Sequence, residues 1–215
     1  MHPPSDPPLP DDRAAYGSKT GIIDKSEAAA NSAEAAAAQA YFDSNDYDFA
    51  SDLLGFYLGN NGPDKEYRIS TANMEKIVAT SDVRDKVSGC LDWIRGEAKR
   101  DPQVNVLREI TTGWVGAGPT DNQDVALGIG HFAVAVGSDT RVEQAADGHG
   151  LTAYVWYNVY VYDYYNFDEK PIDGYNPWHV FQTGVNNDMR QLEEAGWARS
   201  FKARGDISEF WSAAL

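Results

Sequence analysis

The residues most suited to chemistry gather in one stretch in the last third of the chain. An Asp-Tyr-Tyr-Asn-Phe-Asp run covers residues 163–168, and Asp173, Asn176 and His179 follow shortly after it. Carboxylate and amide oxygens are the ligands that Mg²⁺ and Ca²⁺ prefer in proteins. A histidine titrates near neutral pH and can act as a general acid or base. The stretch therefore predicts either a divalent-metal site beside a histidine or a polar loop, in which Asp, Asn and Gly are also usual.

A run rich in tyrosine and valine, Leu151 to Tyr165, leads into this stretch and is typical of a β-strand. Val155, Val159 and Val161 alternate onto one face, which we expect to face the core. Asp163 continues that face at the far end of the strand. A carboxylate turned inward is costly unless it is paired, hydrogen-bonded or bound to a metal. Asp163 is therefore either a metal ligand or, if the strand has already ended, a residue that caps a turn.

The elements that must position these residues fall into two groups. Helical patterns occupy the first half: an Ala-rich stretch at 26–40, then 47–58, and 71–100 with a break at Ser81-Asp82. Period-two alternation begins near Ile129, a turn is expected at 147–150, and a last helix is expected near 185–195. We also expect residues 141–144 to pair with 129–136 across a turn at 137–139.

Strands that cluster rather than alternate with helices predict an α+β fold. We expect residues 1–45 to be a Pro/Ala-rich tail or linker and residues 46–215 to form one compact α+β domain. In that domain a helical N-terminal layer would pack against an antiparallel sheet.

Composition excludes several classes of protein. The chain has 215 residues and a formal net charge of −15, which argues against nucleic acid as the main ligand. Hydrophobic residues make up 42%, enough to form a core. One cysteine, Cys90, leaves no intrachain disulfide. The chain has no apolar run long enough to span a membrane and no signal peptide at its start, so we expect no integral membrane segment.

The run at 163–168 resembles the active-site pattern of the colicin M family, an Asp-x-Tyr-Asp-Phe-Asn strand end followed by His-Arg. Asp163, Tyr165 and Phe167 match the pattern directly, and Asn166 stands where the family has its second acid. No His-Arg pair follows, and the nearest candidates are His179 and Arg190. The layout is also similar to the C-terminal domains of bacterial polymorphic toxins, which share its Leu-Gly-x-Gly-x-Phe motif at 127–132 and its Leu-x-x-x-Gly-x-Ala-x-x-Phe motif at 192–201.

The resemblance implies a half β-barrel and a toxin that cleaves the lipid-linked peptidoglycan precursor, lipid II, with a divalent metal. It implies that Mg²⁺ or Ca²⁺ is held by Asp163, with Asp168 and Asp173 as further ligands. His179 would transfer a proton and Arg190 would face the phosphates, while Tyr165 and Asn166 complete the matched site. It also implies a cognate immunity protein, and action in the cell envelope of a target bacterium after export by a dedicated system or within a larger toxin.

A second hypothesis needs no catalysis. The tyrosine-bearing face of the strand could bind a protein or glycan partner, with residues 163–176 as a polar rim. Changes at Tyr160 or Tyr162 would then abolish binding. The sequence leaves both hypotheses open.

Overall fold

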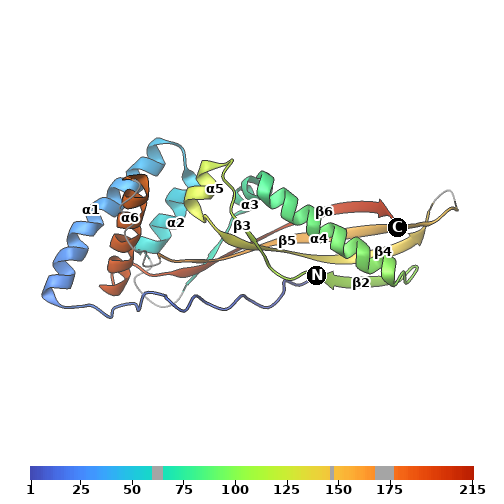
Figure 1. Cartoon of the computed structure of the whole chain (residues 1–215), viewed down its shortest axis with the longest axis horizontal. Helices are drawn as coiled ribbons and strands as arrows, with labels where there is room; N and C mark the ends of the chain where they lie inside the picture. Colours follow the sequence, from blue (N-terminus) through green and yellow to red (C-terminus); the bar gives the residue numbers. More distant parts are fainter. Residues whose placement is uncertain (60–64, 146–147, 168–176) are drawn as a thin grey trace.

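The computed structural model describes residues 1–59, 65–145, 148–167 and 177–215, and the side chains of 177–184 are not described. The molecule is elongated, with helices gathered at one end and a long sheet that extends to the other (Figure 1). The helices are α1 (Ile22–Ser44), α2 (Asp48–Gly59), α3 (Thr71–Val78), α4 (Ser81–Arg100), α5 (Gln123–Gly128) and α6 (Pro177–Glu194). The strands are β1 (Glu66–Arg68), β2 (Leu107–Thr111), β3 (Val115–Ala117), β4 (Phe132–Gln144), β5 (Leu151–Tyr165) and β6 (Phe201–Ala214).

Within the described residues the strands form one open sheet in the order β1-β6-β5-β4-β2, and β3 pairs with the start of β4. Every pair is antiparallel except β1–β6, which is parallel. The predicted turn joins β4 to β5, where Gly148 and Gly150 have φ of 75° and 89°, conformations that glycine adopts without strain. The predicted α+β fold, with helices against a curved, unclosed sheet, is confirmed.

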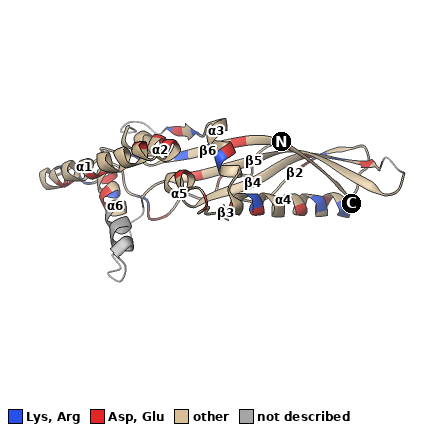
Figure 2. Ribbon diagram, turned by 90° about the horizontal axis from the view of Figure 1, so that it is seen from above, with Lys and Arg blue, Asp and Glu red and all other residues tan. Residues whose placement is uncertain are grey.

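Helices cover one face of the sheet. On that face lie Val134 and Val136 of β4 and Val155, Val159 and Val161 of β5, all buried as the valine pattern predicts. The long α4 packs its apolar stripe against β4 and β3, and α3 packs against β6. Acidic and basic side chains are interspersed along α4 (Figure 2), as expected for a helix with one face in solvent.

Two expectations about strands were wrong. Residues 141–144 do not fold back on 129–136 but continue β4, which runs straight through Gly137. The last helix, expected near 185–195, ends at Glu194 as α6, but no strand was expected after it, whereas Gly196 takes a φ of 81° and β6 begins at Phe201. The signal for β6 is present in the sequence, because Phe201, Ala203, Gly205 and Ile207 alternate with polar residues.

The segment before α2 packs on the rest of the chain. Helix α1 lies against α6, residues 1–6 lie on the sheet face that the helices leave open, and the segment continues to α6, which residues 12–19 contact (Figure 1). Asp6 accepts hydrogen bonds from Lys202 Nζ at 3.0 Å and Arg204 Nη1 at 2.7 Å, and Trp114 Nε1 donates to the Ser5 carbonyl at 2.8 Å. Tyr160 and Tyr162, on this face, are therefore buried rather than exposed.

Candidate functional site

The predicted site begins where β5 ends. Asp163 and Tyr165 continue the helix-covered face of β5 and pair with Ala203 and Phe201 of β6. Asp163 is half-buried and Tyr165 is buried. The expected inward placement of the Asp163 carboxylate is thus what strand alternation produces, because the residues before it on the same face are buried valines. Asn166, the next candidate, is half-buried and follows directly.

An aromatic cluster fixes this end of the strand. The Tyr165 ring stacks on Phe201 at a centroid distance of 4.9 Å and meets Phe167 edge-on at 5.5 Å. Tyr57 of α2 contacts both Tyr165, at 5.9 Å, and Phe167, at 4.9 Å. Burial, and secondarily the Asp163 carboxylate, raise the pKa of the Tyr165 phenol far above its usual range. The Tyr165 ring is therefore neutral and held in place, so its contribution to a site at Asp163 is to position the strand end.

A buried carboxylate that the sequence did not single out stabilises the elements around this cluster. Glu193 of α6 accepts hydrogen bonds from the Ser200 backbone N–H at 2.9 Å and from Ser200 Oγ at 2.6 Å. Tyr57 donates its hydroxyl to the Met189 carbonyl at 2.8 Å. Burial raises the pKa of Glu193 even though the Ser200 hydrogen bonds lower it. These bonds tie α6 to α2 and to the start of β6. A glutamate in a helical pattern gives no sequence signal for such a role.

Arg190 lies on the same helix, one turn before Glu194. Its side chain is only 14% exposed, with Nε 3.3 Å from Glu194 Oε1, and its Nη1 donates to the Asp12 carbonyl at 2.6 Å. The guanidinium thus fastens the N-terminal segment to α6. Arg190 follows Met189, whose carbonyl accepts the Tyr57 hydroxyl, so it lies close to the aromatic cluster at the end of β5. A phosphate group would have to share Arg190 with these two partners.

The remaining candidates cannot be placed. Asp168 and Asp173 lie outside the described residues, and for His179 only the helical backbone of α6 is described. In the described part of the chain, no three His, Cys, Asp or Glu side chains gather as metal ligands would. Asp163 supplies one carboxylate, and the residues that follow it supply further oxygens in sequence. Whether residues 168–176 approach Asp163 lies outside the described residues.

A second polar and aromatic surface lies at the other end of β5, on the open face. Trp156 and Phe210 are 44% and 53% exposed, and their ring centroids are 5.5 Å apart. The alternation of β5 places Trp156 on the face opposite the valines. The sequence did not point to Phe210 as the partner of Trp156, because β6 was not expected as a strand.

Comparison with known proteins identifies no relative of this chain. No family model matches the chain, and neither a curated protein nor a solved structure matches it. Among the described residues, no helix is both long and apolar enough to cross a membrane. Any statement about function therefore depends on the geometry above and on the resemblance of the 163–168 run.

Proposed function

We propose that this chain is an antibacterial toxin domain that hydrolyses the lipid-linked peptidoglycan precursor at its phosphate linkage with the help of Mg²⁺ or Ca²⁺. The observation that supports it is the placement of Asp163. Its half-buried carboxylate lies at the inward face of the strand end, next to an aromatic cluster that holds the strand in position. The oxygen-rich residues up to Asn176 follow immediately. A carboxylate held beside a rigid support is one requirement of a hydrolytic metal site.

The roles of the residues follow from this placement. Asp163, with Asp168 and Asp173, would hold the cation, which polarises a phosphoryl oxygen and lowers the pKa of a bound water. His179 would carry the proton, and Asn166 would hydrogen-bond the substrate. Arg190 would neutralise phosphate charge after exchanging its contact with Asp12. A toxin of this kind acts in the cell envelope of a target bacterium and implies an immunity protein in the cell that produces it.

The experiment compares two compartments and three proteins. The wild type, Asp163→Asn and Glu209→Gln would each be expressed in a bacterium at equal level, once in the cytoplasm and once directed to the periplasm. Glu209 is an exposed carboxylate on β6 and serves as the matched control. We expect lysis only from the periplasm, by the wild type and Glu209→Gln. Asp163→Asn should remain folded and lose at least about 100-fold in hydrolysis of the purified precursor. EDTA should abolish wild-type hydrolysis.

Two results would oppose the proposal: lysis by Asp163→Asn equal to that of the wild type, or hydrolysis that persists in EDTA. If the protein neither lyses cells nor hydrolyses the precursor, the second candidate function stands.

That second candidate is a non-enzymatic binding module, and one observation favours it. The chain exposes the pair Trp156 and Phe210 on the open sheet face. Tyr160 and Tyr162, whose exposure the binding hypothesis assumed, are covered by the N-terminal segment. Binding through this face would therefore fail in Trp156→Ala, whereas Asp163→Asn would bind normally.

A further inference from the structure

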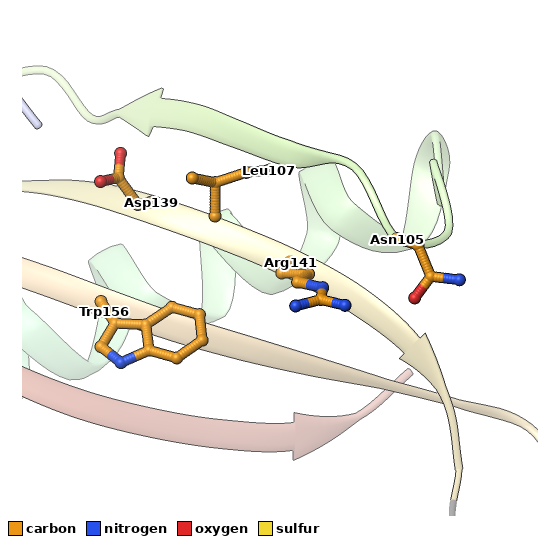
Figure 3. A pocket seen from close by; sticks show the side chains of 5 residues that line it. All are labelled: Asn105, Leu107, Asp139, Arg141 and Trp156. Atoms are coloured by element: carbon orange, nitrogen blue, oxygen red, sulfur yellow. The ribbon is translucent and has the colours of Figure 1, made fainter.

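A shallow pocket of about 400 Å³ lies on the open sheet face, lined by Asn105, Leu107, Asp139, Arg141 and Trp156 (Figure 3). It is separate from the site at the end of β5. Trp156 and Asp163 are seven residues apart on one strand, or about 23 Å at the usual rise. They also point to opposite faces, because an odd separation reverses the side of a strand.

The floor of the pocket is aromatic. The Trp156 indole lies beside Arg141 in the close-up view (Figure 3), and it is supported from β6 by Phe210, whose ring centroid is 5.5 Å away. Leu107, 60% exposed, forms the apolar wall on the β2 side. An exposed indole fixed by a second ring offers a flat apolar platform at little cost in side-chain entropy.

The rim is polar and carries both donors and acceptors. Asp139 and Arg141 are two residues apart on β4 and therefore share this face. Asp139 Oδ1 lies 3.6 Å from the Met1 ammonium, which leaves the second carboxylate oxygen to accept from a ligand. Arg141 is oriented by a bond from its Nε to Glu143 Oε1 at 2.9 Å, which does not use its two terminal nitrogens. Asn105 takes a positive φ of 60° and is anchored by its N–H, which donates to the Val142 carbonyl at 2.8 Å. Its amide group faces the pocket (Figure 3).

We propose that this pocket binds a saccharide, a gluco-configured pyranose whose apolar C–H face stacks on Trp156 while its hydroxyls bond to Asp139, Arg141 and Asn105. Each sugar hydroxyl can donate and accept, so it matches a carboxylate, a guanidinium and an amide together. An aliphatic ligand would remove the solvent-facing polar atoms of Asp139 and Arg141 from water without replacing those hydrogen bonds, which is costly. A polyanion would be repelled by a chain with a net charge of −15.

The test uses two soluble probes, N,N′,N″,N‴-tetraacetylchitotetraose and cellotetraose, titrated into the ¹⁵N-labelled full chain in EDTA. Perturbation of the Trp indole N–H signals gives the dissociation constant. We expect at least one probe to bind with a constant on the order of 1 mM, as is reasonable for an open pocket. Trp156→Ala and Arg141→Ala should each weaken binding about tenfold or more. Trp156→Tyr should retain most of it, because a ring remains.

The matched control is Trp93→Ala. Trp93 is 48% exposed on α4, and its substitution removes a similarly accessible indole from the helical side. It should leave the affinity unchanged. The proposal is overturned if neither tetrasaccharide binds at about 10 mM, or if Trp93→Ala weakens binding as much as Trp156→Ala. Since the titration contains no free metal and is repeated with Asp163→Asn, its outcome is independent of the proposed hydrolysis.

Discussion

At the scale of single residues, the chain places carboxylates where their surroundings change their protonation. Asp188 of α6 faces Glu34 of α1, in the contact between the two helices. Burial raises the pKa of Asp188 to about 6, and both a hydrogen bond with Glu34 and the charge of Glu34 add to the effect. Glu193, one turn further along α6, is more deeply buried and its pKa is also raised. The helical end of the molecule thus carries acids that bind protons more tightly in the folded state than in the unfolded state.

We predict from Asp188 that the stability of this end falls as the pH rises through 6. Because the folded-state pKa is raised, the stabilising contribution of the pair is complete below the ordinary aspartate range and is lost as the pH passes about 6. Asp188→Asn should remove this pH dependence and slow the hydrogen exchange of the α1 amides at pH 8. Amide hydrogen exchange of α1, compared between variant and wild type at each pH, measures it. Glu27→Gln, an exposed change on α1, is the control. Equal exchange in Asp188→Asn and the wild type at pH 8 would contradict the prediction.

At the scale of elements, the sequence predicted most helices because their apolar spacing and caps are local. The break between α3 and α4 at Ser81, and the Gly-rich turn between β4 and β5, are features of a few neighbouring residues. Strand β6 was not expected, since its pairing partner β5 lies far away in sequence. Burial of Tyr160 and Tyr162 likewise depends on residues 1–6 crossing the sheet, a contact that no local pattern encodes.

The candidate site shows the same difference between features set by local sequence and features set by long-range contacts. Strand alternation alone placed Asp163 and Tyr165 on the inward face of β5, and the structure has them there. The pairing of Arg190 with Asp12 and Glu194, and the burial of Glu193 against Ser200, depend on how α6 meets the N-terminal segment and β6. Those contacts join residues that are distant in sequence, so composition and spacing could not reveal them.

The contact between α3 and β6 gives a prediction at this scale. A Cβ at Gly205 would overlap the Met74 sulfur and approach Ile69 Cβ to 2.9 Å. Gly205→Ala should therefore destabilise the protein by about 1–3 kcal/mol, because the packed core must shift to admit it. Gly89→Ala provides the opposite case, since nothing lies within 4 Å of its Cβ position on the exposed side of α4. It should stabilise by about 0.5–1 kcal/mol. Urea unfolding measures both, and equal effects of the two changes would refute this account of the packing.

At the scale of the whole molecule, the N-terminal segment connects the two ends of the elongated fold. Ser5 and Asp6 are fastened to Trp114 and to β6, while the Gly17 N–H donates to the Glu193 carbonyl at the helical end. The segment covers the tyrosines of the open face and begins at the edge of the Trp156 pocket, where the Met1 ammonium lies 3.6 Å from Asp139 Oδ1. The metal site proposed at the inward end of β5 and the saccharide pocket proposed on the open face are thus separated by a covered stretch of sheet.

The ion pairs of Asp6 should hold the N-terminal segment on the sheet, and their removal should loosen this contact. Hydrogen bonds from Arg204, and secondarily from Lys202, lower the pKa of Asp6, so its contribution is present above the ordinary aspartate range and is lost as the pH falls through the lowered value. The carboxylate is 31% exposed, which limits the effect to about 1 kcal/mol through screening. In Asp6→Asn the Trp114 indole N–H, which donates to Ser5, should exchange about fivefold faster at neutral pH. Asp11→Asn, the same change at an exposed position of the same segment, should leave that exchange unaltered. If both variants behave alike, the proline-rich chain is held by its apolar contacts and not by the pairing of Asp6 with β6.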